Sequence, residues 1–148
     1  MATPSAPASV AVVDASVAVK WVVPEAGTVE AQALLADWLA RGIQPIAPSW
    51  FACEVANVLY QQARRGTVTV PDGRELLRRV LAVVALVDAP AADALRAYAI
   101  ADLTAQPTPY DCQYLALAER AGCEYWTDDA RFVRGTQPRF PHVRQLGT

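Results

Sequence analysis

The sequence has few cysteines and a single histidine, which excludes several classes of protein. Only three of its 148 residues are cysteine, which is too few for a disulfide scaffold. Cys53, Cys112 and Cys123 also lack the C-x-x-C spacing of zinc sites, and we interpret them as small apolar residues inside helices or at a helix end. The single histidine, His142, excludes a ribonuclease that relies on paired histidines. Because 53% of the residues are hydrophobic, an intrinsically disordered chain is excluded as well.

Long apolar runs and an excess of one charge are also absent. No segment approaches the ~18 consecutive apolar residues of a membrane helix, and residues 1–9 have neither the basic nor the apolar block of a leader peptide. The formal net charge of −2 argues against non-specific binding to nucleic acid through bulk charge. We therefore expect one cytoplasmic domain over residues 10–148, preceded by a flexible tail at residues 1–9.

Short apolar runs alternate with helical patterns along the chain. Val10–Val13 is a continuous apolar run, typical of a strand that is buried on both faces of a parallel sheet. In the helix expected at 28–41, apolar residues including Ala31, Trp38 and Leu39 recur at helical spacing. Residues 16–23 fit a helix or a strand. Further strands are expected at 43–47, 85–88, 124–127 and around 143. Further helices are expected at 71–84, 91–103 and 110–121, together with one that follows Pro48 and Ser49 and ends near Gly66, and a short helix after Asp129. This alternation predicts an α/β fold with a mostly parallel central sheet.

Four acidic residues lie where this fold gathers ligands. Open α/β sheets bind ligands outside the carboxyl ends of their strands. Asp14 directly follows the first strand, and Asp129 lies just beyond the strand at 124–127. Glu54 and Asp111 fall in the first turns of two helices, so all four are placed to converge at one edge of the sheet.

Each carboxylate also has a simpler explanation. An aspartate after a strand or in the first turn of a helix can serve as a helix cap, which applies to Asp111 and Asp129. Glu54 interrupts an otherwise apolar stretch, although the solvent face of a helix could hold it. If all four meet, their repulsion raises their pKa values or requires positive charge. Lys20 is the only lysine, so a hard divalent cation such as Mg²⁺ is the natural compensation.

Four segments carry these residues in a recognisable order. They are VVDAS at 12–16, EVANVL at 54–59, YDCQYLALAE at 110–119 and TDD at 127–129. Their order and spacing resemble the motifs of PIN-domain ribonucleases, and most closely the VapC toxins of bacterial and archaeal toxin–antitoxin pairs. The resemblance covers nearly the whole chain after Ser9.

The resemblance implies a three-layer α/β/α sandwich and a Mg²⁺-dependent endoribonuclease, with Mn²⁺ as a possible substitute. In such an enzyme, metal-activated water hydrolyses the RNA phosphodiester. Asp128 stands at the variable position of the family's Thr-x-Asp pattern, as an auxiliary ligand or a helix cap, and we favour the cap. The matching catalytic and metal-binding residues are Asp14, Glu54, Asp111 and Asp129, and the matching supporting residues are Ser16, Asn57 and Thr127.

The resemblance also implies partners. A VapC toxin cleaves RNA, inhibits translation, forms a homodimer and is blocked by a VapB antitoxin. Three other functions stay open: a noncatalytic partner-binding domain with the same fold, a PIN nuclease outside toxin–antitoxin systems, and a phosphoacceptor receiver domain. The receiver is the weakest of these, because it requires a late lysine and this chain has none beyond Lys20.

Overall fold

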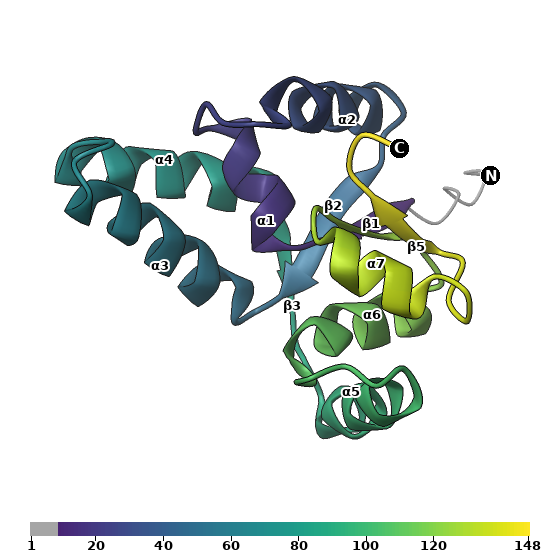
Figure 1. Ribbon diagram of the computed structural model, residues 1–148. Coiled ribbons are helices and arrows are strands. Elements are labelled where there is room, and N and C mark those ends of the chain that lie inside the picture. Colours follow the sequence, from purple (N-terminus) through teal and green to yellow (C-terminus); the bar gives the residue numbers. More distant parts are fainter. Residues whose placement is uncertain (1–8) are drawn as a thin grey trace.

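The computed structural model describes residues 9–148, whose centre is a five-stranded parallel sheet flanked by helices (Figure 1). Every pair of neighbouring strands is parallel, so the α/β prediction is confirmed, and the sheet is wholly rather than mostly parallel. The predicted tail at residues 1–9 lies outside the described residues except for Ser9. In spatial order the strands are β3 (Ala85–Val87), β2 (Gln44–Pro48), β1 (Val10–Val13), β4 (Tyr125–Thr127) and β5 (Val143–Gln145).

The helices lie close to the predicted positions. The ambiguous segment at 16–23 is helical as far as Trp21, as α1 (Ala15–Ala18) followed by the 3₁₀ turn η1 (Val19–Trp21). Helix α4 (Val70–Val83) begins one residue before the predicted start at Pro71, because Thr69 caps the helix by accepting a hydrogen bond from the backbone N–H of Asp72 (3.1 Å). The helical segments are α1 (Ala15–Ala18), η1 (Val19–Trp21), α2 (Thr28–Ala40), α3 (Phe51–Arg64), α4 (Val70–Val83), α5 (Ala91–Leu103), α6 (Tyr110–Ala121) and α7 (Ala130–Thr136).

The core lies between the sheet and its helices. Val12 and Val13 in β1 are fully buried, as expected for a central strand with both faces covered. Helix α6 packs on β1, β2 and β4, and buries Tyr114 and Leu115 against them. In α2, Ala31 and Trp38 are buried, but Leu39 is 63% exposed, so its predicted place in the buried stripe is wrong. Leu39 points to solvent because it lies about 100° around the helix from Trp38.

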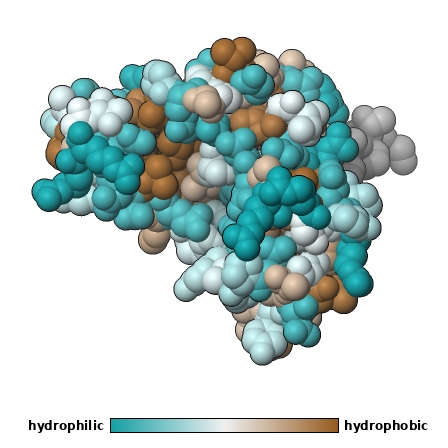
Figure 2. Space-filling model, in the orientation of Figure 1, coloured by the Kyte–Doolittle hydropathy of each residue, from teal (hydrophilic) through white to brown (hydrophobic). Residues whose placement is uncertain are grey.

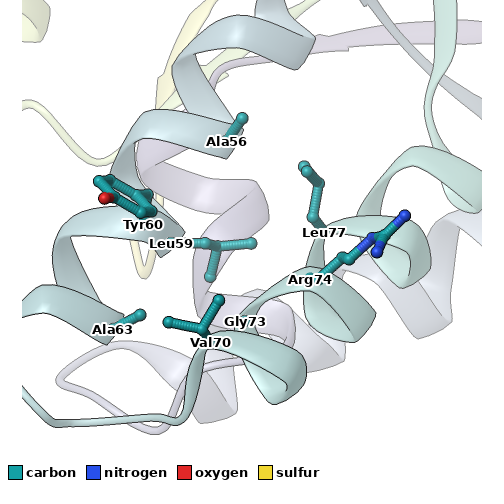
Figure 3. Close-up of a pocket in the computed structure, with 8 residues that line it drawn as sticks. All are labelled: Ala56, Leu59, Tyr60, Ala63, Val70, Gly73, Arg74 and Leu77. Atoms are coloured by element: carbon teal, nitrogen blue, oxygen red, sulfur yellow. The ribbon is translucent and has the colours of Figure 1, made fainter.

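Helices α3 and α4 form a hairpin that extends away from the sheet (Figure 1). Between them is a cavity of about 340 Å³, lined by apolar side chains such as Leu59 and Leu77 (Figure 3). Hydrophobic residues also reach the surface on this side of the molecule (Figure 2). Tyr60 and Val70, which line the cavity, are 55% and 62% exposed. None of the four candidate carboxylates lines this cavity, so it is separate from the predicted site.

Within residues 9–148, no helix combines the length and the apolar character that crossing a membrane requires.

Candidate functional site

The strand order brings the four acidic segments to one edge of the sheet. Strands β2, β1 and β4 are neighbours, so the residues that follow them meet at their carboxyl ends. Asp14 follows β1 and Asp129 lies just beyond β4, while Glu54 and Asp111 lie in the first turns of α3 and α6. Partial burial and the charges of the other three carboxylates raise the pKa of Asp111 from 3.8 to about 6. Asp14, Glu54 and Asp129 therefore each lie near enough to Asp111 to repel its charge.

Asp14 is the most enclosed of the four, with 5% of its surface exposed. Its Oδ1 accepts hydrogen bonds from the Ser16 hydroxyl (2.5 Å) and the Val17 backbone N–H (3.3 Å). Its Oδ2 accepts from the hydroxyls of Thr127 (2.6 Å) and Tyr125 (2.9 Å). Burial raises the pKa of Asp14, and these donors offset part of that rise. Ser16 and Thr127 thus bond to a carboxylate as the resemblance implies, while Asp14 also caps α1.

Glu54 is half-buried and is held by Tyr114, whose hydroxyl donates to Glu54 Oε2 (2.5 Å). Burial and the charge of Asp14 raise the pKa of Glu54, and the Tyr114 hydrogen bond opposes this. The ring of Tyr114 stacks on that of Tyr125, with 5.6 Å between centroids. The stacked rings therefore link the position of Glu54, which Tyr114 holds, to that of Asp14, which Tyr125 holds.

Sequence reasoning missed both tyrosines, although each left a signal. Tyr114 lies three residues after Asp111 on α6, which places both on one helix face. Tyr125 lies two residues before Thr127 on β4, and alternate residues of a strand share a face.

Asp129 is exposed and directly precedes α7. Its Oδ1 accepts hydrogen bonds from the backbone N–H groups of Arg131 (2.9 Å) and Phe132 (3.0 Å), so it is the N-cap of that helix. Its own N–H donates to the Thr127 hydroxyl (3.1 Å). Within residues 9–148, Asp129 Oδ2 accepts no hydrogen bond, so capping leaves one carboxylate oxygen for a ligand.

The favoured role of Asp128 as a helix cap is wrong, because Asp129 occupies the cap position. Asp128 instead pairs with Lys20, whose Nζ lies 3.2 Å from Asp128 Oδ2 and 3.4 Å from a carboxylate oxygen of Glu25. Lys20 itself is buried, with 8% of its surface exposed. The lone lysine of the chain thus fixes Asp128 beside the site.

Three other residues singled out from the sequence, Asn57, Cys53 and Cys112, differ in their exposure to solvent. Asn57 is exposed and makes no hydrogen bond with the described residues, so nothing ties it to the carboxylates. Cys53 is exposed, which contradicts its interpretation as an apolar filler, whereas Cys112 is buried. Cys53 faces solvent because Phe51 and Val55 occupy the buried face of α3.

The donor set fits a hard cation. It consists of carboxylate oxygens, which suit Mg²⁺ and Mn²⁺, rather than the imidazole or thiolate groups that softer metals prefer. In the part of the chain that the structure describes, no three His, Cys, Asp or Glu side chains form a group that could hold a metal ion. Mg²⁺ typically binds only one or two carboxylates and completes its shell with water and substrate oxygens. Joint coordination by all four carboxylates stays a prediction.

Comparisons with known proteins agree with this fold. The crystal structure of PAE2754 from Pyrobaculum aerophilum superposes with a TM-score of 0.69 and 21% sequence identity, over 95% of this chain and 92% of that one. At this identity the likeness shows the fold alone. No curated protein matches the sequence. Residues 11–136 match the model of the PIN domain, a span that includes all four carboxylates. The chain therefore belongs to the PIN domain family.

Proposed function

We propose that this protein is an endoribonuclease that hydrolyses RNA phosphodiester bonds with Mg²⁺, or with Mn²⁺ in its place. PIN domains are generally nucleases and typically use divalent metals. The observation that carries the proposal is that Asp111, at the carboxyl edge of the sheet, lies close enough to Asp14, Glu54 and Asp129 for their charges to raise its pKa. Such a concentration of negative charge repels an RNA phosphate unless a cation is present.

The residues of the site divide into ligands and supports. The bound cation supplies an activated water and stabilises negative charge on the phosphoryl oxygens. Asp14 is the best-oriented ligand, because donors from α1 and β4 fix both of its oxygens. Tyr114 orients Glu54 in the same way from α6. These hydrogen bonds fix the carboxylates before RNA binds, so little reorganisation accompanies the reaction.

We also propose a biological setting for this activity. The protein acts in the cytoplasm as the toxin of a VapBC-type pair, as a homodimer that inhibits translation by cleaving RNA. A VapB-type antitoxin, whose tail is often basic, blocks the carboxylate site. The ordered motifs support this assignment, and an acidic site is complementary in charge to a basic tail.

An RNA cleavage assay tests the nuclease proposal. The wild-type protein should cut single-stranded RNA with Mg²⁺ or Mn²⁺ but not with EDTA. Asp14→Asn and Asp111→Asn should each lower kcat by roughly 100-fold or more, the scale of losing a group that stabilises the transition state. Asp37→Asn is the matched control, because Asp37 lies on α2 in an exposed pair with Arg41. Wild-type activity in both site variants would refute the proposal, and an inactive wild type would favour the noncatalytic alternative.

A growth assay tests the toxin assignment separately. Expression of the wild-type protein should arrest growth, and co-expression of a small reading frame directly upstream should restore it. Asp14→Asn should be harmless. RNA cleavage in vitro without growth arrest would leave a PIN nuclease outside toxin–antitoxin systems.

A further inference from the structure

A second hollow lies against the carboxylate site. It has a volume of about 490 Å³ and is formed by the start of α3, the loop between β3 and α5 with the first turn of α5, and the start of α6. Glu54 is part of its wall, so it opens directly beside one of the four carboxylates. Its volume falls within the ~300–1,000 Å³ of small-molecule sites. It shares no lining residue with the cavity between α3 and α4.

Two aromatic side chains line this hollow. Tyr110, the first residue of α6, is 71% exposed, so packing does not account for its ring. It directly precedes Asp111 in the sequence. Trp50 is half-buried, and its ring packs edge-on against Tyr114, with 4.8 Å between centroids. Since the Tyr114 hydroxyl donates to Glu54, Trp50 in the wall of the hollow packs against a residue that positions one of the four carboxylates.

The polar groups of the wall favour a neutral, planar occupant. Gln113 lies three residues after Tyr110 and so on the same side of α6. Its amide makes no hydrogen bond with the described residues, and it offers both donors and an acceptor, as the edge of a nucleobase does. Glu54 is the only charged side chain of the wall, and its negative charge repels a phosphate.

We propose that this hollow binds one nucleobase of the RNA, beside the phosphodiester held at the carboxylates. Tyr110 supplies a stacking face, and Gln113 hydrogen-bonds the edge of the base and so contributes to the choice of base. The inference rests on the proposed ribonuclease function. Aromatic stacking is the usual way for proteins to hold an unpaired base.

Steady-state kinetics on a fluorogenic single-stranded RNA with Mn²⁺ test the role of Tyr110. Tyr110→Ala should raise KM by about 5- to 100-fold with kcat nearly unchanged, the effect expected from losing one stacked base. Tyr110→Phe keeps the ring and should behave as wild type. Tyr98→Ala is the matched control, since Tyr98 is 74% exposed on α5. Equal KM values for Tyr110→Ala and Tyr98→Ala would overturn the inference.

The same assay on substrates that differ in one base tests Gln113. Gln113→Ala should reduce the ratio of kcat/KM between the preferred base and the others by several-fold, because an amide that pairs with a base edge discriminates against bases that leave it unpaired. An unchanged ratio would remove Gln113 from base selection.

Cys53 provides a readout that does not depend on cleavage, because it is exposed and lines the hollow. Millimolar nucleosides should slow its alkylation by iodoacetamide several-fold, as measured by mass spectrometry, and Tyr110→Ala should abolish this protection. Cys123 lies outside the hollow and is the internal control.

The two readouts separate the two proposals. If RNA is cleaved, the Tyr110→Ala kinetics decide on the base site. If RNA is not cleaved, the nuclease proposal fails, and the alkylation of Cys53 decides. If nucleosides protect Cys53 from alkylation, the hollow is a nucleobase site in a protein without nuclease activity. If they do not, the proposed base site is refuted as well.

Discussion

Asp14 illustrates how single residues build this site. A buried carboxylate is costly in free energy unless donors satisfy its oxygens, and here hydroxyls from α1 and β4 do so. The motif at 12–16 made Asp14 and Ser16 predictable, because they are close in sequence. The contacts of Asp14 with Tyr125 and Thr127 were not predictable from local pattern, because 111 and 113 positions separate the partners.

Replacing Thr127 with valine tests the donors around Asp14. The substitution keeps the shape of the side chain but removes a donor to Asp14 and the acceptor for the Asp129 N–H. We expect the free energy of unfolding to fall by about 1–3 kcal/mol in urea denaturation without metal. Thr148→Val, at an exposed position, should change it by less than about 0.5 kcal/mol. Equal effects of the two substitutions would contradict the assigned role.

The raised pKa of Asp111 predicts how stability depends on pH in EDTA. The folded protein binds the proton of Asp111 more tightly than the unfolded chain, because the pKa rises from 3.8 to about 6 on folding. The contribution of Asp111 to stability is therefore complete below about pH 4 and is lost as the pH rises through about 6. Asp111→Asn should raise Tm relative to wild type at about pH 7.5, which lies above the raised pKa of about 6. The gain in Tm should be smaller at low pH. A Tm difference that does not vary with pH would show that burial and the neighbouring carboxylates do not raise the pKa of Asp111.

At the scale of elements, α6 is the helix on which the site depends most. It carries Asp111 and Tyr114, and it packs on the sheet on one side and on α5 on the other. The buried Asp93 of α5 joins the two helices, since the Arg120 guanidinium donates to both of its oxygens (2.9–3.2 Å). The placement of α6 therefore depends on this ion pair as well as on apolar packing.

Arg120→Ala tests this connection. It leaves the carboxylate of Asp93 without its charged partner at a position that is 5% exposed. We expect the free energy of unfolding to decrease by about 1–3 kcal/mol. Arg41→Ala breaks the exposed pair with Asp37 and should cost less than about 1 kcal/mol. The connection would be unimportant if chemical denaturation gave the same loss for both.

Elements were largely predictable because apolar spacing and Gly or Pro boundaries are local signals. Gly122, for example, ends α6 with φ of 65°, in the left-handed region that glycine favours. The cap of α7 was harder, because Asp128 and Asp129 have the same capping chemistry. Only the backbone path after β4, and the position of Lys20, decide which of the two caps the helix.

At the scale of the whole molecule, the strand order creates the site. The alternation of strands and helices predicted a parallel sheet, but not the order β3-β2-β1-β4-β5. That order places β1 between β2 and β4, so residues from the first and last thirds of the chain meet at one edge. The hollow beside Glu54 also depends on this arrangement, because three separate segments form its wall.

The central claim is that this edge of the sheet holds a divalent cation. Isothermal titration of Mn²⁺ into the metal-free protein tests it most directly, without RNA and without turnover. We predict saturable binding to the wild type and to Asp37→Asn, and loss of that binding in Asp14→Asn and Asp111→Asn. Equal Mn²⁺ binding by all four proteins, or none by the wild type, would contradict the account.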